Sequence, residues 1–144
     1  MSLLSILRQQ FPAEGAPASL RERRVDSALR VLVAAPHPDD FDAVGVTLRW
    51  LARNGNPLEA VVVSTGSGVE DSYAPGLTLE AKARLREREQ RNSARFFGLS
   101  EEALAFLRLK TDDSDQAVDV PENLDRLEGA RLERSPDLLF LPHG

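Results

Sequence analysis

The chain has 144 residues, enough for one domain with a single sizeable core, and its 42% apolar and 28% charged residues are an ordinary globular balance. A net charge of −5 and a pI near 5.1 exclude the basic face of a nucleic-acid-binding protein and offer no attraction to an anionic membrane. The absence of cysteine excludes disulfides and thiolate zinc sites, so a metal would have to be held by His, Asp or Glu.

The first 29 residues predict a short helix followed by a connector. Residues 3–10 have amphipathic helical spacing, and residues 11–19, FPAEGAPAS, have the Pro, Ala and Gly content of an irregular linker. The apolar run near the start is short and has no basic residues before it. We therefore expect neither a signal peptide nor a membrane span, and a cytoplasmic protein is the default.

Strand and helix patterns alternate over the rest of the chain. Nearly continuous apolar runs predict buried strands, and the segments between them have helical spacing. This alternation is typical of a mostly parallel sheet with helices on both faces. We predict a three-layer, Rossmann-like α/β domain over residues 30–144, with strands at 30–35, 58–65, 103–109 and 137–144 and helices at 41–53, 78–97 and 121–134.

Capping and breaking residues set the expected ends of these helices. Gly55 and Pro57 follow the first helix and stop it. Thr78 is expected to cap the amino end of the second helix, and Gly98 to follow its last turn. Pro121 suits the first position of the third helix.

One motif places unusual charge directly after the first strand. Residues 33–42, VAAPHPDDFD, contain His37, Asp39, Asp40 and Asp42, and ligands of such folds bind beyond the carboxyl ends of the strands. Aspartates at a helix start commonly cap its free N–H groups, which is one interpretation. Metal binding is the other, because the flanking prolines stiffen the turn and a cation would relieve the repulsion between adjacent aspartates.

This motif resembles the signature of the LmbE-like or PIG-L-like N-deacetylases, His-Pro-Asp-Asp-x-Glu. Here the signature reads from His37 to Asp42, with Asp42 in place of the glutamate. The Gly-Gly-Thr-Leu element that follows in the family is reduced to residues 45–48, GVTL.

Weaker matches extend the resemblance over residues 30–144. Residues 65–68, TGSG, follow the second strand, and Arg86 and Glu89 match an Arg-x-x-Glu pair on the next helix. An acidic loop at Asp112 and Asp113 and a final Pro-Asp-Leu-Leu-Phe strand at residues 136–140 complete the order.

The resemblance implies a hydrolase that removes an N-acetyl group from a small amino-sugar conjugate with the help of zinc or another divalent metal. His37 and Asp40 would be two of the three protein ligands, and Asp39 the general base that deprotonates the attacking water. Arg86 and Asp113 would contact the substrate, with Asp112 nearly as suitable as Asp113. Asp42 would not bind the metal itself but would hydrogen-bond to the residues that position the metal ligands.

The family's third metal ligand comes from a His-x-x-His segment after the fourth strand. This chain ends at residues 141–144, LPHG, where His143 is expected to be a neighbour of that segment rather than the ligand. We therefore expect an N-terminal part of a deacetylase domain that is incomplete at its carboxyl end, and little or no hydrolysis by these 144 residues alone.

Two alternatives follow from the same residues. One is a catalytically incomplete or inactive member of the fold that serves in binding or assembly. The other is a nucleotide-binding α/β domain whose aspartates only cap a helix. A homo-oligomer is compatible with each of these interpretations.

Overall fold

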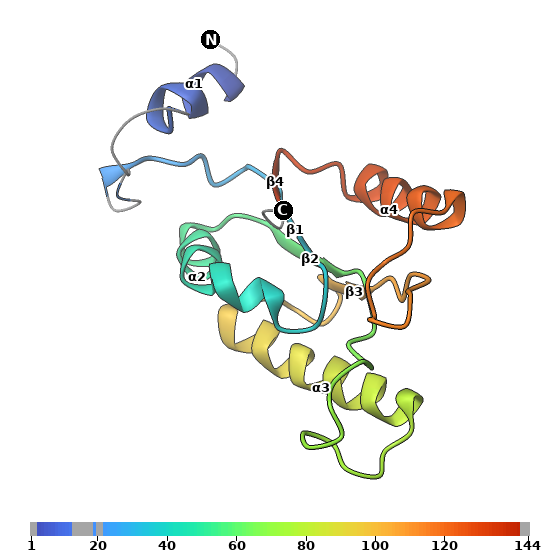
Figure 1. The fold of residues 1–144 in the computed structure, drawn as a ribbon. Helices are drawn as coiled ribbons and strands as arrows, with labels where there is room; N and C mark the ends of the chain where they lie inside the picture. Colours follow the sequence, from blue (N-terminus) through green and yellow to red (C-terminus); the bar gives the residue numbers. More distant parts are fainter. Residues whose placement is uncertain (1–2, 13–18, 20–21, 142–144) are drawn as a thin grey trace.

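Four short strands form one parallel sheet in the order β3-β2-β1-β4 in the computed structural model, which describes residues 3–12, 19 and 22–141 (Figure 1). The strands are β1 (Val31–Ala35), β2 (Leu58–Val62), β3 (Leu104–Phe106) and β4 (Leu138–Phe140). The helices are α1 (Leu3–Gln10), the 3₁₀ turn η2 (Asp40–Val44), α2 (Gly45–Asn54), α3 (Leu79–Phe97) and α4 (Pro121–Arg134).

The two central strands are buried on both faces, as their continuous apolar runs predict. On one face of the sheet, Val33 and Val62 belong to a core cluster with residues of α2 and α3, while Leu32 and Val61 pack with Ala130 of α4 on the other. Figure 1 shows α2 and α3 on one side of the sheet and α4 on the opposite side. The predicted three-layer α/β fold is therefore confirmed.

The predicted capping residues lie where the helices begin and end. The Thr78 hydroxyl accepts a hydrogen bond from the Ala81 N–H at 3.2 Å, and α3 ends at Gly98, whose φ of 96° lies in the left-handed region. Gly55 ends α2 in the same way with φ 92°, and α4 begins with Pro121. The predicted bounds of α3 and α4 agree with the structure to within one residue.

Four predicted elements differ from the structure, one of which is the strand expected at 58–65, which ends at Val62. The helix expected at 41–53 begins one residue earlier as the 3₁₀ turn η2 and becomes α-helical only at Gly45. The strand expected at 103–109 is only Leu104–Phe106, because Arg108 has a positive φ of 46° that an extended strand does not tolerate. The last strand ends at Phe140, and residues 142–144 with His143 lie outside the described part of the chain.

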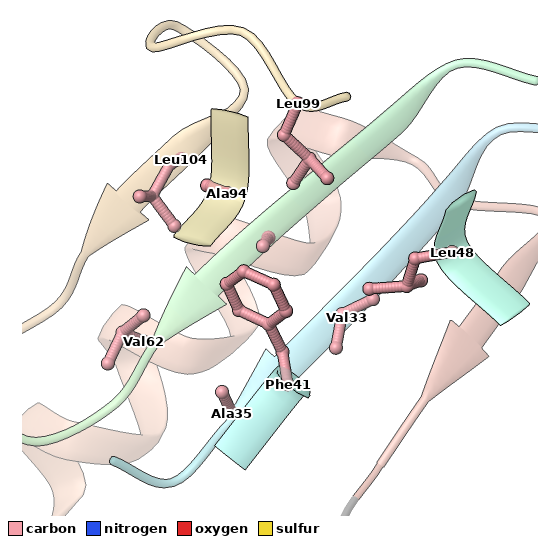
Figure 2. Packing of buried hydrophobic residues seen from close by; sticks show 9 residues of the cluster. Val33, Ala35, Phe41, Leu48, Val62, Ala94, Leu99 and Leu104 are labelled. Atoms are coloured by element: carbon pink, nitrogen blue, oxygen red, sulfur yellow. The ribbon is translucent and has the colours of Figure 1, made fainter. Parts of the chain in front are cut away.

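Phe41 connects the start of η2 to the core. Only 1% of this residue is exposed, and its ring packs in the cluster that contains Val33, Ala35 and Val62 (Figure 2). The Phe97 ring of α3 meets it edge-on at a centroid distance of 6.0 Å. The turn that follows β1 is thus held at the carboxyl ends of the central strands.

Strand order reverses direction between β1 and β4, because β2 and β3 lie on one side of β1 and β4 on the other. Parallel sheets form a crevice at such a switch point, outside the carboxyl ends of the strands. Among the helices within the described ranges, none is both long and apolar enough to cross a bilayer.

Candidate functional site

His37 and Asp40 lie together in the turn after β1. The imidazole Nδ1 is 3.1 Å from Asp40 Oδ2, and the same oxygen accepts a hydrogen bond from the His37 backbone N–H at 2.9 Å. Both side chains are partly exposed, at 31% and 43%. The turn therefore presents one nitrogen and one oxygen ligand at a common point that solvent can reach.

This pair has the chemistry and the spacing of two ligands of one zinc ion. Zinc binds imidazole nitrogen and carboxylate oxygen at about 2.0–2.2 Å, so two ligand atoms of one ion are roughly 3–3.5 Å apart. The observed separation lies in that range. Within residues 3–12, 19 and 22–141, no group of three or more metal-ligating side chains is placed to hold an ion.

Gln116 approaches the other nitrogen of the same imidazole. Its Nε2 is 3.3 Å from His37 Nε2, across the carboxyl ends of the strands. Which ring nitrogen carries the proton sets the direction of this contact and of the contact with Asp40. The pairing orients the imidazole from the side opposite Asp40.

Asp39 has an unusual backbone and an ion-pair partner. Its φ of 94° is left-handed, and its side chain makes no capping hydrogen bond to η2. Instead, Asp39 Oδ2 accepts from Arg86 Nη2 at 2.7 Å, and the Asp39 backbone N–H donates to Gln90 Oε1 at 2.6 Å. Helix capping is therefore not the role of this carboxylate in the structure.

Arg86 joins the turn to α3 and to the loop before it. It donates to the Pro38 carbonyl oxygen at 2.8 Å and to Glu89 at 2.8 Å, and it stacks 5.6 Å from the ring centre of Tyr73, whose hydroxyl donates to Glu89. Burial opposes its charge, but the hydrogen bonds to Asp39 and Glu89 outweigh burial, so the pKa of the guanidinium lies above its usual range.

Asp42 points to α3. Its Oδ1 accepts a hydrogen bond from the Ser93 hydroxyl at 2.6 Å. Gln90 and Ser93 follow Arg86 by four and seven positions, so the three side chains share one helical face. That spacing was the available signal for the two residues that sequence reasoning missed.

The acidic loop divides its aspartates between different environments. Asp112 Oδ1 accepts from the backbone N–H groups of Ser114 and Gln116 and so shapes the loop, while Asp113 is exposed. Asp115 is 7% exposed, and its buried Oδ2 has no hydrogen-bond partner within the described residues. Asp115, interpreted from the sequence as part of a solvated acidic loop, and Gln116 were not among the expected site residues, and no periodic pattern in the sequence indicates them.

Two cavities flank the His37–Asp40 pair. One of about 580 Å³ lies at the switch point, with mostly apolar walls that include Phe41 and Phe140. The other, of about 290 Å³ and here called the polar cavity, is lined mostly by polar and charged residues, among them Asp39, Arg86 and Asp115 in addition to the pair itself. His37 and Asp40 thus lie between a cavity lined mostly by apolar residues and the polar cavity.

Comparison with known proteins identifies a family whose model matches most of the chain. The family model PIG-L, described as GlcNAc-PI de-N-acetylase, matches residues 32–144, and no curated protein matches the chain. The matched range contains all of the sheet except Val31, together with the His37–Asp40 turn and both cavities. The chain therefore belongs to the PIG-L family, whose description indicates a deacetylase type of activity.

Proposed function

We propose that this protein is a zinc-dependent hydrolase that removes the N-acetyl group from an amino-sugar conjugate. The observation that carries the proposal is the convergence of His37 and Asp40 beside Asp39 at the carboxyl end of β1. Family membership supports a deacetylase in general, and the polar cavity beside the pair supports a polar substrate. Residues 30–144 would form the amino-terminal part of the domain.

His37 and Asp40 would hold the metal, with a further ligand from outside the described residues. When bound, zinc lowers the pKa of water toward about 7 and polarises a carbonyl oxygen. Asp39 would take the proton of the attacking water and return it to the departing nitrogen. The carbonyl carbon–nitrogen bond breaks, and acetate and a free amine leave.

The surroundings of Asp39 suit this role. The Asp39 side chain is 61% exposed, so water can reach the carboxylate. The Arg86 side chain, which is only 13% exposed, forms an ion pair with Oδ2. A base must be within hydrogen-bond reach of the proton that it takes, so a fixed carboxylate beside the metal ligands is what the reaction needs.

The substrate contacts are proposed for the polar cavity. Arg86 would contact an anionic or hydroxylated group, and Asp113 remains a candidate for a sugar hydroxyl. Asp115 is better placed than Asp113, because it lines the cavity and its Oδ2 lacks a donor among the described residues. A hydroxyl of the sugar would supply that donor.

A second candidate function is a catalytically incomplete member that acts in binding or assembly. It is favoured by the ligand set, because the described part of the chain brings together two of the three protein ligands that a catalytic zinc usually has. The two candidates differ in whether zinc binding is accompanied by turnover.

Elemental analysis and an amine-release assay over a panel of N-acetylated sugars test the proposal. In a protein that includes the family's His-x-x-His segment, we expect His37→Ala and Asp40→Ala each to lose zinc, and Asp39→Ala to keep zinc while hydrolysis falls by at least about 100-fold. Asp125→Ala, an exposed acid on α4, is the matched control and should change neither. Zinc retained in both ligand variants, or turnover retained in Asp39→Ala, contradicts these assignments; zinc without turnover in the parent favours the second candidate.

A further inference from the structure

Three polar side chains on one face of α3 hold the turn that carries the candidate site. Arg86 binds the Asp39 side chain, Ser93 binds the Asp42 side chain, and Gln90 binds the Asp39 backbone. We propose that Gln90 is a positioning residue, which fixes the left-handed backbone of Asp39 and thereby aims its carboxylate at the His37–Asp40 pair. This inference rests on the proposed role of Asp39 as the base.

The backbone of Asp39 needs an external restraint. A φ of 94° is uncommon for a residue with a side chain and persists where neighbouring groups hold it. The Asp39 N–H donates to Gln90 Oε1 at 2.6 Å. Because this hydrogen bond joins the backbone of the turn to a side chain of the long helix α3, it can supply that restraint.

Gln90 is an unusual residue for its position. It is 1% exposed and lies one helical turn before the core residue Ala94, where an apolar side chain would pack at no polar cost. Its Nε2 is buried and has no hydrogen-bond partner among the described residues. A buried amide with one unpaired group is unfavourable, so the contact of its oxygen with Asp39 is the interaction that explains its presence.

The orientation of the amide is determined by the contact. Only the oxygen of the side chain can accept from the Asp39 N–H, because two N–H groups would repel each other. Arg86 does not replace this interaction, since it binds Asp39 Oδ2 and the Pro38 carbonyl rather than the Asp39 N–H. Gln90 therefore restrains the backbone and Arg86 the side chain of the same residue.

The metal ligands do not depend on Gln90 in this arrangement. Asp40 Oδ2 is held by the His37 backbone N–H and faces the His37 ring. Removing the Gln90 oxygen should therefore free Asp39 while the His37–Asp40 pair stays in place. That separation of effects distinguishes a positioning residue from a residue that only stabilises the fold.

Gln90→Met tests the proposal, because methionine has a similar length and no strong acceptor. We expect hydrogen exchange of the Asp39 amide to become at least about 10-fold faster, zinc content to stay unchanged, and kcat to fall about 10-fold with KM within about twofold. Gln90→Glu keeps the acceptor and should restore protection of the Asp39 amide. Arg88→Met places the same side chain at an exposed position of α3 and should change none of these quantities.

The outcomes separate this inference from the proposed function. Unchanged exchange of the Asp39 amide in Gln90→Met, or faster exchange with unchanged kcat, overturns the inference. A parent that includes the family's His-x-x-His segment and still shows no hydrolysis refutes the proposed function, and the exchange measurement then still decides whether Gln90 holds Asp39. If Gln90→Met does not fold, hydrogen exchange in the parent protein is the test. An Asp39 amide that exchanges as fast as the amide of exposed Asp113 would overturn the inference.

Discussion

Gly45 shows how closely the first residue of α2 approaches α3. A Cβ atom at this position would overlap the ring of Phe97, so only glycine fits without moving that ring. The ring is itself packed against Phe41 and Phe96. Gly129 of α4 is the opposite case, because a Cβ there meets nothing within 4 Å.

The two glycines make a matched pair for one substitution. We expect Gly45→Ala to lower the free energy of unfolding by about 1–3 kcal/mol through overpacking. Gly129→Ala should raise it by up to about 1 kcal/mol, because alanine favours the helix. Urea denaturation measures both, and equal shifts in the two variants would show that the Phe97 contact does not restrict Gly45.

At the residue scale, the sequence predicted which groups carry the motif but not what surrounds them. His37, Asp39 and Asp40 follow from the order of the motif, and two of them lie together. The contacts of Gln90 and Gln116 were not foreseen, because they join segments 51 and 79 positions apart. Amide side chains carry no charge that would single them out in one chain.

The edge strand β4 is tied to β1 by a charged contact at its start. Asp137 Oδ2 accepts from the Arg30 backbone N–H at 2.9 Å and from Arg30 Nε at 3.2 Å. The backbone N–H and the guanidinium favour the charged carboxylate, so the pKa of Asp137 lies below its usual value. This contact joins Arg30, directly before β1, to Asp137, directly before β4.

The lowered pKa sets the sign of a pH effect. A carboxyl with a depressed pKa in the folded state stabilises the fold above its unfolded pKa, near 3.9, and this contribution disappears as the pH falls through the folded value. Asp137→Asn should therefore be less stable than the parent at pH 6, with a difference that shrinks toward pH 2. Urea denaturation across this range measures it, with Asp125→Asn as the control; a constant difference would contradict the assignment.

At the element scale, helix ends were predictable where a capping residue acts locally. Thr78 and Gly98 fix α3 through hydrogen bonds to residues three or four positions away. The start of the preceding helix was not predictable, because the left-handed Asp39 depends on α3, far along the chain. β3 ends at Phe106, and Arg108, two residues later, has a positive φ and pairs with Glu87 at 2.6 Å, a contact 21 positions apart in the sequence.

At the scale of the whole molecule, the reversal of strand order beside β1 creates the space in which the candidate site lies. Alternating elements predicted a parallel sheet, but not that β4 would return to the free edge of β1. The position of the motif at a strand end was predictable, whereas the cavities depend on which strands are neighbours. Within the described residues, no third metal-ligating side chain joins His37 and Asp40.

Metal binding should stabilise the whole fold if His37 and Asp40 hold an ion. A ligand that binds only the folded state adds about 2.7 kcal/mol at a concentration 100 times its Kd. We expect zinc to raise the thermal midpoint of the metal-free parent and of Asp39→Ala, but not of His37→Ala or Asp40→Ala. Scanning fluorimetry over a zinc titration checks this, and an equal rise in His37→Ala would place the ion elsewhere.

The segment between β2 and α3 is fastened to the helix that follows it. Buried Lys82 donates to the Val69 carbonyl oxygen and to Asp71, each at 2.8 Å, and Tyr73 reaches Glu89. Gly66, Gly68 and Val69 from the same segment line the polar cavity. Exchange of residues 66–68, two of which line that cavity ahead of the contacts at Val69, Asp71 and Tyr73, would reshape one wall of the cavity and leave the sheet unchanged, so these positions are where a new substrate selectivity could be engineered.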